Sequence, residues 1–165
     1  MSLGSSHVLP RSQLLKMQVL IEARSLLLLH AGVTLFMMGL IWVIQLVHYP
    51  LFALVGSESY TQYHLAHMKR ITWIVAPVML LELISSVAIV YLSILTSAQL
   101  GYLGLGLLTF IWICTALFQV PAHNQLSKIW NQGVHARLVR SNWMRTVAWS
   151  ARGVLALWML SDSLH

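Results

Sequence analysis

Four histidines lie next to apolar stretches, where they could form one site. His48 and His123 follow the apolar runs that end in "QLVHYP" and "FQVPAHN", and His64 and His67 precede the next long apolar run, in "YHLAHMKR". Neutral imidazole is the commonest metal ligand, and two histidines on neighbouring helices can ligate a haem axially. We expect all four in one layer near one membrane face, holding a metal or haem or exchanging protons. Contacts with lipid headgroups and backbone carbonyls are the alternative.

A polar stripe occurs where the last apolar stretch begins, in "SNWMRTVAWSAR". Asn142, Arg145, Trp149 and Arg152 are spaced i, i+3, i+7 and i+10, so they share one face of a helix. We expect this face to wall an internal polar pocket, with Asn142 and Arg145 near its mouth, where they stabilise a phenolate or oxyanion.

The roles predicted for these residues fall into three groups. The catalytic candidates are His48, His123, Asn142 and Arg145; the substrate-binding candidates are Gln45, Gln119 and Trp149; the metal-ligand candidates are His48, His64, His67 and His123. The cofactor is unknown: it is a histidine-ligated metal or haem, or there is none. His30 is expected to be a hydrogen-bonded packing residue and His135 to be solvated.

Glu82 and Arg152 are expected to form an ion pair. By the rise of about 1.5 Å per helical residue, both lie near the middle of their spans. An unpaired charge buried there costs several kcal/mol, whereas a paired one is tolerated. Separate neutralisation or snorkelling of the two side chains is the alternative.

The composition places these residues in membrane helices. Of 165 residues, 58% are hydrophobic and 8% charged, against about 25% charged in a typical soluble domain. Stretches of about 18 apolar residues cross a bilayer as helices. We predict an all-α, four-transmembrane-helix bundle with spans at about 26–53, 71–95, 100–120 and 146–161, after an N-terminal leader or interfacial segment at 1–25. The first apolar run is too long for a cleaved signal peptide.

The basic residues gather in the connections between spans. The connections between spans one and two and between spans three and four hold Lys69, Arg70, Lys128, Arg137, Arg140 and Arg145. The positive-inside rule places these connections in the cytoplasm and both termini outside. Membrane topology and anionic lipid account for the net charge of +6, so we expect a bilayer and a lipophilic small molecule as partners, no nucleic acid, and a possible homo-oligomer.

The two halves of the chain resemble each other. Gln45 precedes Arg70 by 25 residues and Gln119 precedes Arg145 by 26, and a histidine and a proline follow each glutamine. A degenerate repeat of two helical hairpins is one interpretation, and chance similarity in a short chain is the other.

The second half also resembles a known family. "QVPAHNQL", followed by "NWMRTVAW", is similar to the motifs of the anthrone-oxygenase-like family of small four-span membrane proteins, at Pro121, Asn124 or His123, Leu126, Asn142, Arg145 and Thr146. The resemblance covers about a quarter of the chain. It implies a four-helix membrane bundle and, in some members, oxygenation of a polycyclic phenol. "YHLAHMKR" and Glu82 have no counterpart in these motifs.

These patterns favour a membrane oxidoreductase or oxygenase acting on a lipophilic aromatic or quinone-like substrate in a histidine-rich pocket. One alternative is a non-catalytic lipid-binding, scaffold or small transport protein, whose polar stripes only join helices. Another is an electron-transfer protein with a histidine-ligated haem or metal. A four-span glutathione transferase, using Arg137, Arg140 and Arg145, also stays open.

Overall fold

The protein is all-helical in a computed structural model that describes residues 10–92 and 98–163. No strand occurs within these two ranges, so the expected all-α fold is confirmed. The long helices there are α1 (Arg11–Val43), α3 (Ser57–Leu92), α4 (Ala98–Cys114) and α6 (Gln132–Asp162). The shorter elements are η1 (Ile44–His48), α2 (Tyr49–Leu51), η2 (Phe52–Leu54), η3 (Thr115–Gln119) and α5 (Val120–Leu126).

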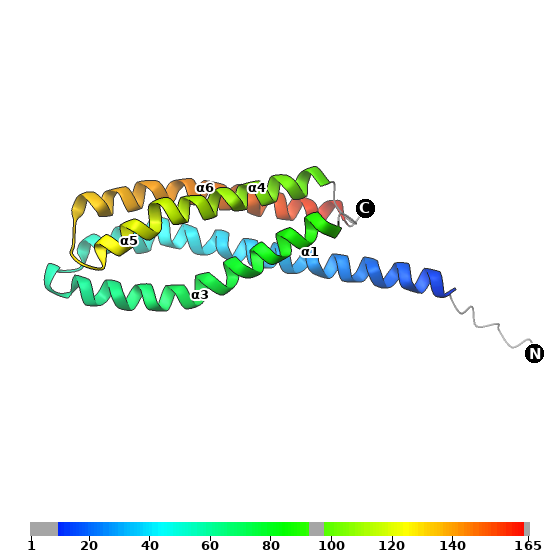
Figure 1. Ribbon diagram of the computed structural model, residues 1–165, viewed down its shortest axis with the longest axis horizontal. Helices are drawn as coiled ribbons and strands as arrows, with labels where there is room; N and C mark the ends of the chain where they lie inside the picture. Colours follow the sequence, from blue (N-terminus) through cyan, green and yellow to red (C-terminus); the bar gives the residue numbers. More distant parts are fainter. Residues whose placement is uncertain (1–9, 93–97, 164–165) are drawn as a thin grey trace, which may run out of the picture.

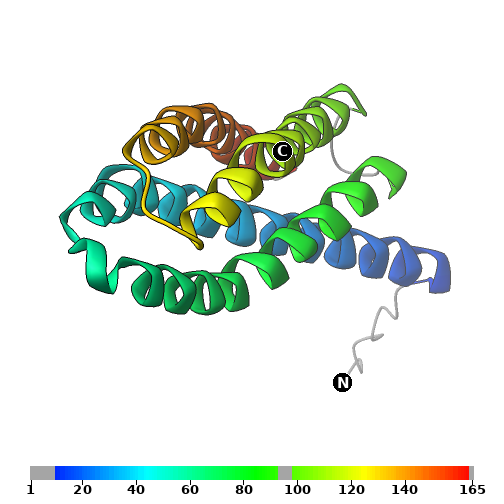
Figure 2. The ribbon, with the colours of Figure 1, turned by 60° about the vertical axis from the view of Figure 1, so that its left-hand side comes forward.

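The long helices pack side by side (Figures 1 and 2). α1 packs against α3 and α6, and α4 packs against the same two helices. The α2–α3 and α5–α6 connections lie together at one end, and the beginning of α4 and the end of α6 lie at the other. The beginning of α1 extends past that second end. Side chains of all four helices can therefore meet inside the bundle.

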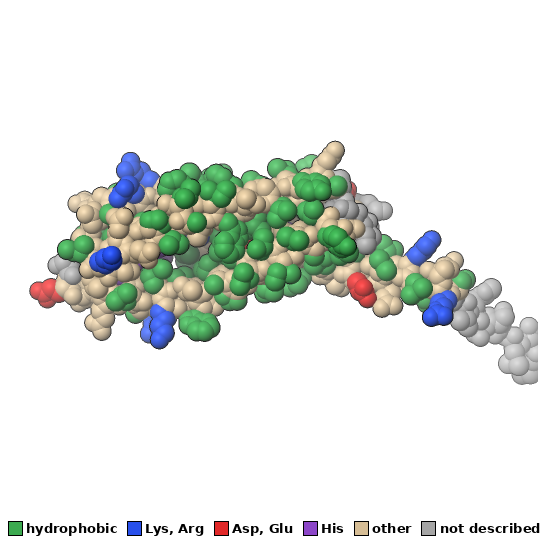
Figure 3. All heavy atoms as spheres, viewed as in Figure 1, with side chains coloured by type: hydrophobic (Ala, Val, Ile, Leu, Met, Phe, Trp, Pro, Cys, Tyr) green, Lys and Arg blue, Asp and Glu red, His purple; other side chains and the backbone are tan. Residues whose placement is uncertain are grey.

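Three helical segments are long and apolar enough to cross a membrane: Arg11–Leu54, Glu58–Leu92 and Ala98–Leu126. Figure 3 shows apolar side chains along the middle of one face, with Lys and Arg near one end and on the beginning of α1. This distribution indicates an integral membrane protein. The first two helices begin at Arg11 and Ser57, earlier than expected, because helical hydrogen bonding continues through polar residues beyond the apolar run. Residues 93–95 of the expected second span lie outside the described residues.

The expected fourth span, 146–161, lies within α6, which is not among the three apolar segments. Four arginines along α6 lower its average apolarity. The helix begins after Asn131, whose Oδ1 accepts a hydrogen bond from the Val134 N–H at 3.0 Å. This cap satisfies one of the free N–H groups of the first turn.

Two π-helical turns, η1 and η3, occur at similar places in the two halves. Each precedes a proline by two residues: Pro50 follows His48, and Pro121 follows Gln119. A proline ring inside a helix has no N–H and crowds the carbonyl four residues earlier, so a wider turn before the ring relieves the conflict. The turns place Gln45 and Gln119 in the interior, where both are buried.

α1 and α6 approach each other closely at Gly153. A Cβ atom added there would overlap the Sδ atom of Met38. The buried side chains of Met37, Ile41 and Trp149 lie in the core that these helices share.

Candidate functional site

The structure brings the four predicted histidines together at one end of the bundle. His48 belongs to η1, His64 and His67 to α3, and His123 to α5. The ring centroids are 4.3 Å apart for His48 and His67, 5.2 Å for His64 and His123, and 6.3 Å for His67 and His123. The i, i+3 spacing of the α3 pair presents both rings to the other two elements.

The ring nitrogens form hydrogen bonds in pairs. His48 Nε2 lies 2.7 Å from His67 Nδ1, and His64 Nε2 lies 3.3 Å from His123 Nδ1. The second pair continues to two tyrosine hydroxyls: Tyr60 lies 3.3 Å from His64 Nδ1, and Tyr49 lies 2.9 Å from His123 Nε2. Both nitrogens of His64 and of His123 are thus occupied.

This pairing does not form a metal site as it stands. Within the ranges that the structure describes, no group of three or more His, Cys, Asp or Glu residues is arranged to hold a metal ion. A metal needs several lone pairs that converge on one point, whereas these nitrogens face one another and the tyrosine hydroxyls. The metal or haem role of these histidines stays a prediction.

A cavity of about 390 Å³ lies beside the histidines, between α3 and the α4–η3–α5 segment. Its walls are mostly apolar and include Ile71, Val75, Met79 and Trp112. The polar side chains on its walls include Tyr49, His67, Gln119, His123 and Arg145. The cavity is partly open, and Figure 3 shows the bundle surface hollowed between α3 and α5.

Arg145 is the residue that α6 contributes to the cavity wall. Its Nη1 donates to Asn142 Oδ1 at 3.0 Å, and Asn142 Nδ2 donates to Gln45 Oε1 at 2.8 Å. Its guanidinium carbon lies 5.0 Å from the Trp149 ring centroid, a cation–π contact. Gln45, Asn142 and Trp149 do not line the cavity: Asn142 and Trp149 contact Arg145, and Gln45 contacts Asn142.

Two buried polar atoms on this wall lack a hydrogen-bond partner: Gln119 Oε1 and Arg145 Nε. The other end of the Gln119 amide donates to Ser141 Oγ at 2.9 Å, so the side chain is held in place. Among the described residues, no carboxylate lies within ion-pair distance of Arg145. Two residues of this wall therefore keep one unpaired acceptor, one unpaired donor and a positive charge with no carboxylate beside it, although the two unpaired atoms themselves are closed to solvent; such a set suits a ligand oxygen.

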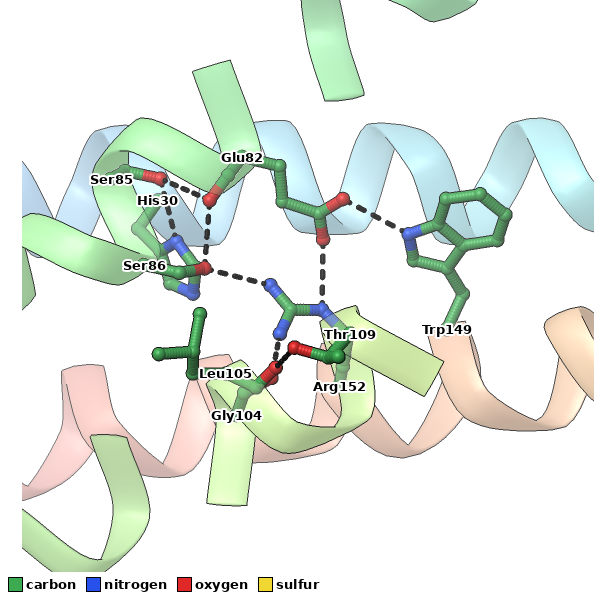
Figure 4. Close-up of polar contacts among 9 residues, drawn as sticks. All are labelled: His30, Glu82, Ser85, Ser86, Gly104, Leu105, Thr109, Trp149 and Arg152. Carbon is green, nitrogen blue, oxygen red and sulfur yellow. Dashed lines mark hydrogen bonds and ion pairs between the residues drawn. The ribbon is translucent and has the colours of Figure 1, made fainter. Parts of the chain in front are cut away.

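The structure also brings Glu82 and Arg152 together, in a separate buried network deeper in the bundle (Figure 4). Arg152 Nε lies 3.0 Å from Glu82 Oε1, and both side chains are buried. Trp149 Nε1 donates to the other carboxylate oxygen at 3.1 Å. Arg152 also donates to the Gly104 carbonyl and, at 3.2 Å, to Ser86 Oγ. Each charged group thus has several partners, which its burial requires.

Arg152 does not line the large cavity, although its helical face is close to that of Arg145. It borders a cavity of about 10 Å³ with His30 and Ser86, which is room for about one water molecule. His30 is buried and its Nδ1 lies 2.8 Å from Ser85 Oγ, as a packing histidine should.

Two features of the histidine layer were not expected from the sequence. His135 was expected to be solvated, but it is buried, and its Nε2 donates to the Tyr49 carbonyl at 2.8 Å. Tyr49 itself was not identified, although its hydroxyl joins the layer to the cavity. Its position in "HYP", beside a predicted histidine, was the available signal.

The fold and this interior define a helical integral membrane protein with a mostly apolar cavity that several polar side chains also line. Comparison with protein-family models, curated proteins and solved structures gives no match to this chain. Evidence on function therefore comes from the residues of the site alone.

Proposed function

We propose that this protein binds a lipophilic phenolic or quinone-like molecule in the cavity between α3 and α4–η3–α5 and exchanges a proton with its oxygen. The supporting observation is the pair of unpartnered buried atoms on one wall, Arg145 Nε and Gln119 Oε1. A buried polar atom left unpaired costs about 1–3 kcal/mol. Both residues line the cavity, and a phenolic hydroxyl there would accept from the guanidinium and donate to the amide carbonyl once these two atoms, which are closed to solvent, turned towards it.

The positive charge of Arg145 favours a ligand oxygen that can become negative. Arg145 has neutral hydrogen-bond partners in Asn142 and the Tyr49 hydroxyl and an aromatic neighbour in Trp149, but no carboxylate. A phenolate or enolate bound beside it would neutralise the guanidinium in surroundings of low dielectric. Catalysis would then use His67, which lies on the cavity wall, as the acid–base group, because both ring nitrogens of His123 are occupied.

The size and lining of the cavity fit a ligand that arrives from the bilayer. Its volume of about 390 Å³ lies within the range of about 300–1,000 Å³ usual for small-molecule sites. Apolar side chains such as Ile71, Met79 and Trp112 would contact the rings of such a ligand. An opening in the side of the bundle permits lateral entry from lipid.

The proposal includes α6 as a fourth membrane-crossing helix. Its interior face carries Arg145, Thr146 and Arg152, which are buried, whereas Val147, Val154 and Trp158 are more than half exposed. A helix that is polar inside and apolar outside suits lipid surroundings, where ionisable groups face the bundle interior. Mean hydropathy along the helix does not distinguish these two faces. The excess of basic residues near the α2–α3 and α5–α6 connections would place both termini outside.

The reaction class remains the one favoured by the sequence. An oxidoreductase or oxygenase would pass electrons from the bound phenol to a second substrate, which for an oxygenase is dioxygen. The resemblance to the anthrone-oxygenase-like family, at Pro121, Asn142 and Arg145 among others, supports this class but stays a prediction.

A non-catalytic lipid-binding protein is the second candidate, and one groove favours it. A cavity of about 330 Å³ between α5 and α6 is lined by Arg137 and Arg140 at one part and by Leu117 and Phe118 at another. Basic groups next to an apolar groove suit an anionic lipid.

Ligand binding by purified protein in detergent separates these functions. We expect 2-hydroxyanthraquinone to bind the wild type, and Arg145→Gln to lose about tenfold or more in affinity, equivalent to about 1.4 kcal/mol, without losing thermal stability. Arg137→Gln is the matched control and should bind normally. Uptake of dioxygen on adding 2-hydroxyanthrone, whose ring CH2 is oxidised to the quinone carbonyl with release of water, would identify an oxygenase. Equal binding by Arg145→Gln, or no binding by the wild type, would contradict the proposal.

A further inference from the structure

A second groove lies on the other side of His67. It has a volume of about 340 Å³ and is lined from α1, η1 and α3, with Leu40, His48, Tyr63 and Arg70 among its walls. His67 lines both this outer groove and the inner cavity. The two spaces are therefore separated at this point by one imidazole ring and its apolar neighbours.

His48 and His67 are joined by the shortest hydrogen bond within the histidine layer. His48 Nε2 lies 2.7 Å from His67 Nδ1, and both rings are only half-buried. His48 lines the outer groove but not the inner cavity. The second nitrogen of each ring, His48 Nδ1 and His67 Nε2, has no hydrogen-bond partner within the described ranges. His64 and His123 differ, because both nitrogens of each ring are occupied.

We propose that the His48–His67 pair carries protons between the inner cavity and the outer groove. The inference rests on the proposed function, since the proton comes from the bound phenol. The phenol O–H turns from Gln119 Oε1 towards His67 Nε2 and gives its proton there, and His67 Nδ1–H passes a proton to His48 Nε2. His48 Nδ1–H then releases a proton to water in the outer groove. One phenol becomes one phenolate, one proton leaves, and both rings end neutral in the opposite tautomer.

The surroundings favour this direction of transfer. Arg145 on the inner wall stabilises the phenolate that is left behind. Arg70 in the outer groove disfavours a second positive charge on His48, so the proton leaves to water. His64 and His123 also face His67, at 6.2 and 6.3 Å between ring centroids, and their occupied nitrogens give them no free acceptor.

Phe52 holds the pair in position. Its ring makes edge contacts with both imidazoles, with centroids 5.0 Å from His48 and 5.1 Å from His67. This packing restricts ring rotation, which keeps the two nitrogens aligned during the transfer.

The experiment is a stopped-flow pH jump with 2-hydroxyanthraquinone bound to the detergent-solubilised protein, following the absorbance of its phenolate. We expect His48→Ala to bind the dye normally but to slow phenolate formation about 10²-fold, in the range of general acid–base effects. Imidazole added to the solution should enter the outer groove and restore the rate. Tyr63→Phe alters the same groove without breaking the pair and is the control.

A second variant distinguishes loss of the imidazole from misfolding. His48→Gln keeps a side chain of similar size, and it should bind the dye with the same slow proton exchange. Unchanged exchange in a folded, dye-binding His48 variant would overturn the shuttle, as would a slow rate that imidazole does not restore. Failure of the wild type to bind the dye would instead refute the proposed function.

Discussion

Removing one partner of the buried Glu82–Arg152 pair should destabilise the protein more than removing both. Glu82→Gln leaves the Arg152 guanidinium with only neutral acceptors, Ser86 Oγ and the Gly104 carbonyl. Arg152→Gln leaves the carboxylate with Trp149 Nε1 as its remaining side-chain donor. Stranding a buried charge costs about 3–5 kcal/mol, whereas replacing the whole pair is often nearly neutral. We expect each single variant to lose about 3–5 kcal/mol of unfolding free energy and the double variant about 1–3 kcal/mol.

The assay is a double-mutant cycle measured by equilibrium unfolding in mixed detergent micelles. The expected coupling energy is about 3 kcal/mol or more, because the double variant strands no charge. Glu82→Gln combined with Arg140→Gln, an exposed arginine on the same helix, should be additive within about 0.5 kcal/mol. Additive losses for Glu82→Gln and Arg152→Gln would show that the two side chains do not interact, and would contradict the contact that they make between α3 and α6 across the bundle interior.

Two further stability predictions follow from α6. Asn131→Ala should lower the unfolding free energy by about 1 kcal/mol, because Val134 N–H loses its cap; an unchanged value relative to Gln132→Ala would contradict the cap. Gly153→Ala should be less stable than Gly32→Ala by about 1–3 kcal/mol, because only the first adds a methyl group against another helix. Equal thermal stability of the two glycine variants would mean that α1 and α6 are not closely packed there.

The histidine layer could be predicted because its position depends on local sequence. Each histidine lies at an end of an apolar run, and the ends of successive spans must meet at the same membrane face. Helical spacing places Tyr60 on the face of His64, but the hydrogen-bond pairing within the layer also depends on ring orientation and on Tyr49, which spacing does not fix. The burial of His135 could not be predicted either, because its hydrogen-bond partner is a carbonyl 86 residues away in sequence.

Helical periodicity predicts that Arg145 and Arg152 share one face of α6. In the structure, however, the two side chains belong to different sites. Seven residues of helix separate them by about 10.5 Å along the axis, enough for one to reach the cavity and the other to reach Glu82. The two halves of the chain are similar in their π-helical turns, which contain Gln45 and Gln119. They differ in their arginines, because Arg70 is exposed and Arg145 is buried.

Photo-crosslinking with 4-hydroxybenzophenone tests the central claim most directly. This phenol reacts on illumination with nearby C–H bonds, and methionine is a favourable target; the proposed cavity contains Met68 and Met79. We predict, by mass spectrometry of the digested protein, labelling of α3 at these methionines and of α4 near Trp112, with labelling lost in Arg145→Gln and retained in Arg137→Gln. Labelling concentrated elsewhere on the bundle, or unchanged in Arg145→Gln, would contradict a phenol-binding site held by Arg145.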